Sequence, residues 1–256
     1  MSTLLEVEGL TKRFGGVRAV NDVTFSVTTG EILGLIGPNG AGKTTTFNLI
    51  SGFFSSDEGR VALDGRRLTG LRPDQIAAMG VARTFQGTRL FPRLTVAETL
   101  QTAVLAHSSV GFWADWLGFS SARRAEATAA QRSTEVMQWI GLEARGNEVA
   151  ASLAYAHQSL LGLGLALAMR PRLLLLDEPF AGMNPGETRD AAQMVRRIRD
   201  TGVTVVLVEH DMGAVMGLCD RIVVLDQGGK IADDTPERIR SDPHVIEAYL
   251  GTDADA

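Results

Sequence analysis

Residues 37–44 read Gly-Pro-Asn-Gly-Ala-Gly-Lys-Thr, and this segment constrains the fold of the chain more than any other. The apolar run at residues 31–36 before it is typical of a buried strand, and residues 45–51 after it have a helical pattern. A strand, a glycine-rich turn and a helix create a nest of backbone N–H groups beside the positive end of the helix dipole. The segment therefore predicts an α/β fold with a phosphate-binding loop.

Lys43 and Thr44 carry the side-chain chemistry expected of this loop. The Lys43 ammonium can reach the outer phosphates of a nucleotide, and the Thr44 hydroxyl can hold Mg²⁺. The alternative is a surface turn that happens to contain glycines, but the loop matches at every fixed position and on both flanks. The predicted nucleotide-binding residues are Gly37, Pro38, Asn39, Gly40, Ala41, Gly42, Lys43, Thr44 and Thr45.

Charge and cysteine content narrow the class of protein. The net charge is −5 and no basic run is present, so nucleic acid is not an expected partner. Cys219 is the only cysteine, which indicates a reducing cytosol, and we expect it to be a small core residue. Residues 153–169 are the most apolar stretch but contain His157 and Gln158, which favours a buried helix over a membrane span. With no signal pattern at the N-terminus, a soluble subunit is expected.

The pattern along the chain predicts an α/β core interrupted by a helical insert. Strand patterns lie toward both ends of the chain, whereas residues 95–141 are alanine-rich, charged and helical in pattern. The candidate strands are residues 4–8, 23–27, 61–63, 81–85, 173–176 and 203–208, with a late hairpin at 222–226 and 230–232 and helices at 191–199 and 243–250.

Two carboxylates follow the four-leucine strand at residues 173–176. Asp177 would stand at the edge where a parallel sheet binds ligands, and a carboxylate there can reach Mg²⁺. Glu178, one residue further, can orient and deprotonate an attacking water. An acidic turn with no function is the alternative, and the presence of a phosphate loop in the same chain favours the catalytic interpretation.

Three further residues are weaker candidates. Gln86 ends the strand predicted at residues 81–85, where it could bind Mg²⁺ or the attacking water. His210 follows the strand predicted at 203–208 and could hydrogen-bond a γ-phosphate, although a lone histidine there is more often structural. Phe14 lies in a predicted glycine-flanked loop, residues 12–16, where it could stack on an adenine ring or simply pack.

Taken in order, these residues resemble the ATP-binding subunit of an ABC transporter. The resemblance covers nearly the whole chain, through Phe14, residues 37–44, Gln86, residues 173–178, residues 181–184 and His210. Finer matches are similar to the larger ATP-binding subunit of branched-chain amino acid importers. They lie in residues 81–86, 89–96, 209–226 and 235–251, and the aromatic insert at 112–117 suits the longer helical lobe of that subunit.

The resemblance implies a fold, cofactors and partners. The fold is an ABC-type P-loop core at residues 1–86 and 166–256, with a mixed sheet flanked by helices plus an antiparallel β part, and an inserted helical subdomain at 87–165. ATP and Mg²⁺ are the implied cofactors, with Thr44, Gln86 and Asp177 at the metal and Lys43, Gln86, Glu178 and His210 in catalysis. The implied partners are a second ATP-binding subunit, transmembrane permease subunits and, indirectly, a solute-binding protein. The implied location is cytoplasmic, peripheral on the inner face of the cell membrane.

Residues 153–158 depart from the family pattern. The family's signature loop usually reads Leu-Ser-Gly-Gly-Gln or Leu-Ser-Tyr-Gly-Gln and reaches the γ-phosphate bound by the partner subunit. This chain has Leu-Ala-Tyr-Ala-His-Gln, so the implied contact residues are Ala154, Tyr155, Ala156 and His157. A lost hydrogen bond to a charged group costs roughly 1.5–3 kcal/mol, and a positive φ at Ala156 would add about 1 kcal/mol of strain. We therefore expect a heterodimer in which the partner has an intact signature loop.

Asn184 stands where the family often has aspartate, which puts the coupling between the two nucleotide sites in question. A nucleotide-gated regulatory subunit with weak hydrolysis is an alternative that the altered signature loop favours and that Glu178 and His210 oppose. A non-transport ABC ATPase usually has tandem cores or long coiled-coil inserts, and this chain has one core and a short insert. A small-molecule kinase fits least, since Asp177 and Glu178 suit water activation.

Overall fold

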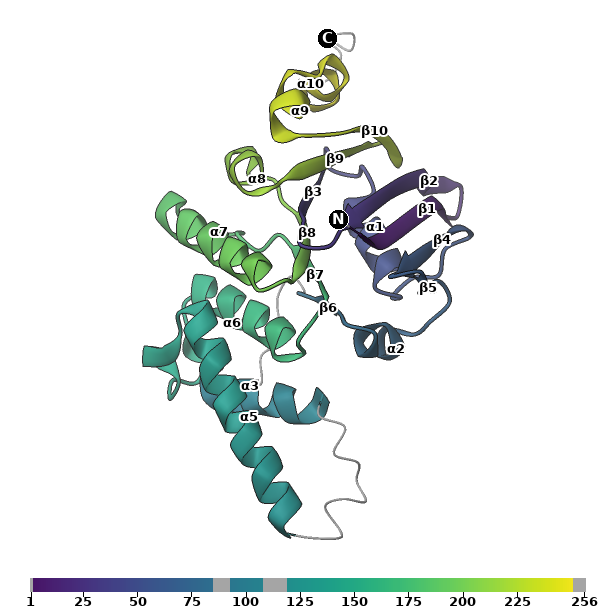
Figure 1. Cartoon of the computed structure of the whole chain (residues 1–256). Coiled ribbons are helices and arrows are strands. Elements are labelled where there is room, and N and C mark those ends of the chain that lie inside the picture. The colour runs from purple at the N-terminus through teal and green to yellow at the C-terminus, as the bar shows by residue number, and fades with distance from the viewer. Residues whose placement is uncertain (1, 85–92, 108–118, 251–256) are drawn as a thin grey trace. The chain divides into compact units, whose positions relative to one another are not determined.

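The computed structural model describes residues 2–84, 93–107 and 119–250. The chain forms two compact units (Figure 1). The core unit comprises Met1–Arg83, Arg172–Glu178 and Val195–Ala256, and the helical unit comprises Thr84–Pro171 and Pro179–Met194. The predicted helical subdomain, residues 87–165, lies inside the helical unit and stays a prediction as a separately folding segment.

A six-stranded mixed sheet forms the centre of the core unit. Its strand order is β10 (Gly229–Asp234), β9 (Arg221–Asp226), β3 (Ile32–Ile36), β8 (Thr204–Val208), β7 (Leu173–Asp177) and β6 (Val81–Arg83). Neighbouring strands are parallel except β10, which pairs antiparallel with β9. Strands β3, β7 and β8 are buried along their whole length, as continuous apolar runs in a parallel sheet require. The predicted mixed sheet and late hairpin are confirmed.

A second, four-stranded sheet in the core unit is antiparallel throughout. Its order is β2 (Val17–Thr28), β1 (Thr3–Phe14), β4 (Glu58–Leu63) and β5 (Arg66–Arg67). The loop predicted at residues 12–16 is wrong, because Phe14 pairs with Val17 and the strands continue to the turn. Two residues suffice to reverse a hairpin when the first adopts a positive φ, and Gly15 has a φ of 57°.

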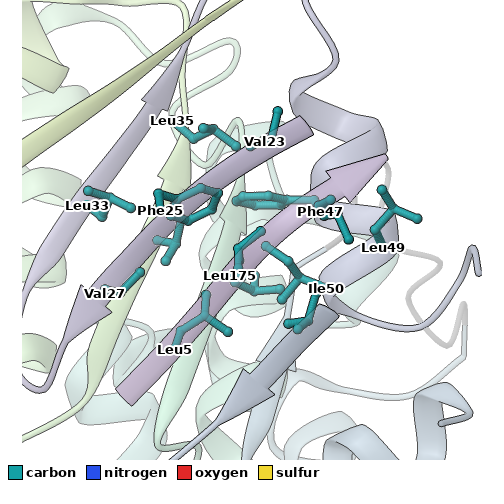
Figure 2. Close-up of a cluster of buried hydrophobic side chains, with 14 of the residues drawn as sticks. Leu5, Val23, Phe25, Val27, Leu33, Leu35, Phe47, Leu49, Ile50 and Leu175 are labelled. Atoms are coloured by element: carbon teal, nitrogen blue, oxygen red, sulfur yellow. The ribbon is translucent and has the colours of Figure 1, made fainter. Parts of the chain in front are cut away.

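Helix α1 (Lys43–Ile50) is anchored in a hydrophobic cluster with strands of the core unit. Figure 2 shows Phe47 and Ile50 of α1 among Leu5 of β1, Phe25 of β2 and Leu35 of β3. Burying such a side chain contributes about 1.5–3 kcal/mol, so these contacts hold the first turn of α1 in place after β3. The other helices of the core unit are α2 (Pro73–Ala78), α8 (Met212–Leu218), α9 (Pro236–Ser241) and α10 (Pro243–Leu250).

The helical unit is built on α3 (Val96–His107), α5 (Phe119–Ile140) and α6 (Tyr155–Ala168). Gly164 of α6 permits close packing, since a Cβ there would lie 2.7 Å from Ile140 and 3.2 Å from Leu100. The 3₁₀ helices η1 (Glu143–Arg145) and η2 (Ala150–Ser152) lie between α5 and α6, and α7 (Pro185–Asp200) begins in this unit. The apolar stretch at residues 153–169 forms α6, with several buried side chains, as predicted. Within the described ranges, no helix has both the length and the apolar character needed to span a membrane.

Candidate nucleotide-binding site

The carboxyl ends of β3, β8 and β7 are neighbours, because these strands pair in that order. Gly37 follows β3, His210 follows β8 by two residues, and Asp177 ends β7. Parallel sheets bind ligands at this edge. A cavity of about 220 Å³ lies here, lined by Ala19, Asn39, Gly40, Ala41, Gly42, Lys43, Thr44, Thr45, Glu178 and His210. The sequence singled out all of these residues except Ala19, for which it held no signal.

Two glycines of the loop have no room for a side chain. Gly37 has a φ of 151°, and a Cβ on it would lie 2.1 Å from the carbonyl oxygen of Leu225. Gly42 has a φ of 100°, and a Cβ there would lie 2.4 Å from the carbonyl oxygen of Ala19. The loop backbone therefore packs directly on neighbouring backbone, which only glycine allows.

Lys43 begins α1 and is only 6% exposed. Its Nζ donates to the carbonyl oxygens of Gly37 at 2.7 Å and Pro38 at 2.9 Å, so the ammonium lies within the curve of the loop. Burial lowers the pKa of Lys43, and the charges of Glu178 and Asp177 act in the opposite direction. An ammonium has three donors, which leaves one for an anion in the cavity.

The first turn of α1 is suited to an anion. Its N-cap, Gly42, provides no side-chain hydrogen bond, and no acidic residue lies in the first turn. The partial positive charge of the helix terminus is therefore not neutralised locally. Thr44 and Thr45 line the same cavity, which fits a hydroxyl ligand for a phosphate-bound cation. The cradle thus has the donors that the phosphates of a nucleotide require.

Glu178 and His210 form a pair at the edge of the sheet. His210 Nε2 lies 2.8 Å from Glu178 Oε1. Glu178 has a φ of 49°, a left-handed conformation that costs a non-glycine residue about 1 kcal/mol, and its N–H donates to the Val208 carbonyl oxygen at 2.9 Å. Strain held in place by neighbouring structure is typical of functional positions. The predicted contact of His210 with a γ-phosphate stays a prediction.

Asp177 is buried beside a cation that the sequence reasoning missed. Arg83 Nη2 donates to Asp177 Oδ2 at 2.8 Å, and the two side chains are 7% and 6% exposed. The available signal was a charged residue inside the apolar strand pattern at 81–85. The described residues contain no cluster of three or more His, Cys, Asp or Glu side chains that could hold a metal. A metal bound by Asp177 would therefore also need hydroxyl, phosphate or water oxygens, which is usual for Mg²⁺.

Of the predicted site residues that the structure describes in the core unit, Phe14, Gly37, Pro38 and Asp177 are not among those that line this cavity. Phe14 closes β1 and packs edge-on against Phe54, with 5.2 Å between ring centroids, and it remains 44% exposed. Lys12 Nζ lies 5.6 Å from the centroid of the Phe14 ring, and stacking of this ring on a base stays a prediction. Gln86 and the aromatic insert at residues 112–117 lie outside the described residues.

The signature-loop residues lie in the helical unit, at the start of α6. Ala154 is the N-cap of this helix and makes no side-chain capping bond. Tyr155 is 54% exposed, and the loop is held by Gln158, whose Nε2 donates to the Leu153 carbonyl oxygen at 2.8 Å. Ala156 is in the first turn of the helix, and its φ is not positive. The strain considered for Ala156 is therefore absent, because this residue has a helical backbone.

Asn184 caps α7. Its Oδ1 accepts from the N–H groups of Gly186 at 2.9 Å and Glu187 at 3.1 Å, while Glu187 Oε2 accepts from the Asn184 N–H at 2.9 Å. This reciprocal capping box needs a hydrogen-bond acceptor and no charge. Asparagine therefore preserves the local structure of this loop.

Comparison with known proteins adds the family context. Residues 20–181 match the ABC transporter family, and residues 230–255 match the branched-chain amino acid ATP-binding cassette transporter family. The chain is 45% identical over 249 residues to the high-affinity branched-chain amino acid transport ATP-binding protein BraF of Pseudomonas aeruginosa, covering 97% of this chain and 98% of BraF. It has the same identity and coverage with LivG of Escherichia coli K12. A crystal structure of the ADP conformation of an ATP-binding cassette matches with a TM-score of 0.84 and 28% identity, over 98% of this chain and 100% of that one.

Proposed function

Because the chain belongs to the ABC transporter family, as an ATP-binding subunit that hydrolyses ATP to power transport, we propose that it drives the uptake of branched-chain amino acids or related small solutes. The choice of solute is supported by BraF and LivG, which match over nearly their whole length. The C-terminal match at residues 230–255 supports the same group.

The observation that carries the proposal is the convergence of Lys43, Glu178 and His210 on one cavity. A carboxylate beside a phosphate cradle can orient a water and accept its proton. The 2.8 Å contact with His210 fixes the Glu178 carboxylate in one orientation. Lys43, held by the loop carbonyls, supplies positive charge where the transferred phosphoryl group gains negative charge.

ATP and Mg²⁺ fit the residues present. The loop N–H groups and the first turn of α1 would hold the phosphates, and Thr44 with Asp177 would hold the metal, together with Gln86. Bound Mg²⁺ neutralises phosphate charge and orients the phosphates for in-line attack. Phe14 is proposed to stack on the adenine, since its ring keeps 44% exposure at the end of β1.

The test measures hydrolysis and uptake in the assembled transporter. The chain is co-purified with its permease, reconstituted in vesicles and supplied with leucine, isoleucine or valine and the solute-binding protein. We expect solute-stimulated ATP hydrolysis that falls by about 10²-fold or more in Glu178→Gln, with nucleotide binding retained. Glu237→Gln, at an exposed position of α9, is the matched control and should behave as wild type. Hydrolysis that persists in Glu178→Gln would contradict the assigned base.

The proposed assembly is a dimer of ATP-binding subunits on two permease subunits, peripheral on the inner face of the membrane. We favour a heterodimer, because Ala154 offers no hydroxyl to a partner's nucleotide and makes no cap for α6. A partner with an intact signature loop would complete the nucleotide site of this chain. Mass analysis of the co-purified complex distinguishes one kind of ATP-binding subunit from two.

A second candidate function is a nucleotide-gated regulatory subunit with weak hydrolysis. The uncapped signature loop at Ala154 favours it, whereas the paired Glu178 and His210 favour hydrolysis. Turnover that is insensitive to Glu178→Gln in the complex, with ATP binding intact in this chain, would select the regulatory role.

A further inference from the structure

Arg83, the last residue of β6, is a buried cation with fixed partners. Its Nη2 donates to Asp177 Oδ2 at 2.8 Å, and its Nη1 donates to Asn48 Oδ1 at 2.7 Å and to Ser51 Oγ at 3.1 Å. Asn48 lies on α1 and Ser51 is the C-cap of that helix. Arg83 therefore connects the acidic end of β7 with the end of the helix that follows the phosphate loop.

Two aromatic rings lie next to the guanidinium of Arg83. Its carbon lies 5.6 Å from the ring centroid of Phe47 and 5.9 Å from that of Phe53. Phe47 is fully buried in the cluster that Figure 2 shows. These cation–π contacts, together with the directed hydrogen bonds, restrict the geometry of Arg83. The carboxylate of Asp177 thus faces a cation that cannot easily move away.

We propose that Arg83 is a positioning residue that competes with Mg²⁺ for Asp177 and thereby sets the metal dependence of nucleotide binding. The inference rests on the proposed function, in which Asp177 belongs to the Mg²⁺ site. A divalent cation at Asp177 meets a carboxylate already paired with a guanidinium, and the two cations repel each other. Arg83 therefore weakens Mg²⁺ binding, while it compensates a buried carboxylate that would otherwise be costly to the fold.

This competition connects Mg²⁺ binding at Asp177 with helix α1. Through Asn48 and Ser51, the guanidinium holds the C-terminal end of α1, whose N-terminal end carries Lys43. In the sequence Gln86, the other predicted metal ligand, follows Arg83 by three residues.

The test uses the full chain with Arg83→Met, which keeps an apolar stem between the rings and removes the charge. Arg60→Met is the matched control, because Arg60 makes a two-point ion pair with Glu8 on the surface, with side chains 57% and 48% exposed. Mg²⁺ is titrated into protein carrying a fluorescent ADP analogue, and affinity for that analogue is also measured in EDTA. The Mg²⁺ concentration at half-saturation should fall about tenfold in Arg83→Met and stay unchanged in Arg60→Met.

Thermal unfolding without Mg²⁺ or nucleotide gives a second readout. Arg83→Met should lower the Tm by roughly 10 °C, and adding Asp177→Asn should restore part of it, because an amide needs no counter-charge. Arg60→Met should leave the Tm nearly unchanged.

Unchanged or weaker Mg²⁺ affinity in Arg83→Met, with affinity in EDTA intact, overturns the proposal. Should Arg83→Met not fold, Arg83→Lys decides: it loses the Asn48 and Ser51 contacts, and its Mg²⁺ affinity should rise less but in the same direction. No rise there overturns the proposal as well. A wild-type chain that fails to bind the analogue with Mg²⁺ overturns the proposed function instead.

Discussion

The phosphate loop and the signature loop both lead into a helix that has no side-chain cap, but they offer a nucleotide very different chemistry. Gly42 precedes α1, where Lys43, two threonines and a packed backbone turn surround a cavity. Ala154 precedes α6 and brings no hydroxyl to that helix terminus, which offers an anion backbone N–H groups and the helix dipole. We therefore expect the chain to retain the residues for its own nucleotide and to contribute little to that of a partner.

The largest expected effect comes from the backbone packing of the phosphate loop. Gly37→Ala places a Cβ 2.1 Å from the Leu225 carbonyl oxygen, so the turn has to move and nucleotide affinity should fall by about 100-fold or more. Gly40→Ala is the matched control: Gly40 also has a positive φ, 83°, but a Cβ there meets no atom within 4 Å. Its loss should stay below about tenfold, the cost of roughly 1 kcal/mol of strain. Equal losses, measured by calorimetry, would mean that packing of the loop is not what positions it.

The next largest effect is expected from Ala154→Ser, which tests whether the signature loop binds a partner's nucleotide weakly. Ala154→Ser restores a hydroxyl at the N-cap of α6, where φ of −58° and ψ of 151° suit a capping serine. A hydrogen bond to a partner's phosphate should raise ATP-driven dimerisation about tenfold, measured by sedimentation in a Glu178→Gln background. Ala151→Ser, at an exposed position of η2, is the control.

A capped helix alone would also stabilise the monomer, by about 0.5–1 kcal/mol. A rise in Tm without stronger dimerisation therefore separates a local effect from contact with the partner's nucleotide. Unchanged dimerisation would show that Ala154 does not weaken the contact with the partner's nucleotide. The two loops would then not differ in this respect.

A smaller effect is expected at Phe14. If Phe14 stacks on the adenine, Phe14→Ala should weaken ATP binding about fivefold, measured by calorimetry. Val17→Ala, at the facing hairpin position and 68% exposed, controls for changes in the hairpin itself. No loss of ATP affinity, or a loss equal to that of Val17→Ala, would assign Phe14 to packing against Phe54.

The same contrast shows what the sequence could predict. Asp177, Glu178 and His210 each follow a continuous apolar run, and parallel strands bring such ends together, so their convergence could be predicted. Arg83 pairs with a residue 94 positions away, and no local pattern indicates that β6 lies beside β7. The positive φ of Glu178 likewise arises from its tertiary surroundings.

The failures at local level have physical causes too. We expected a loop at residues 12–16 because of Gly15 and Gly16, but cross-strand pairing continues as far as Phe14 and Val17. The helix α6 begins at Tyr155, and Ala156 in its first turn is a strong helix former at a position where the family pattern has glycine. The cap at Asn184 could be predicted from the sequence, since Asn184 and Glu187 have the spacing of a capping box.

The smallest expected effect concerns the packing beneath the phosphate loop. A Cβ on Gly34 of β3 would lie 3.0 Å from Cys219 Sγ, so the thiol fills the space beside the strand that leads into the loop. Burial, and after it the charge of Asp220, raises the pKa of Cys219 from 9.0 to about 12. The folded state therefore holds the proton more tightly than the unfolded state does.

Because the folded pKa is the higher one, the stabilisation from the neutral thiol is fully present below pH 9.0 and is lost as the pH rises toward about 12. Relative to Cys219→Ala, the wild-type protein should lose about 1 kcal/mol of unfolding free energy between about pH 8 and about pH 10, measured by urea unfolding. Parallel pH profiles for the two proteins would mean that the thiol ionises as readily when folded. Cys219, which packs beside the strand that leads into the phosphate loop, would then be as accessible to water as the exposed start of α6. The difference between the two loops would in that case come from their own side chains alone.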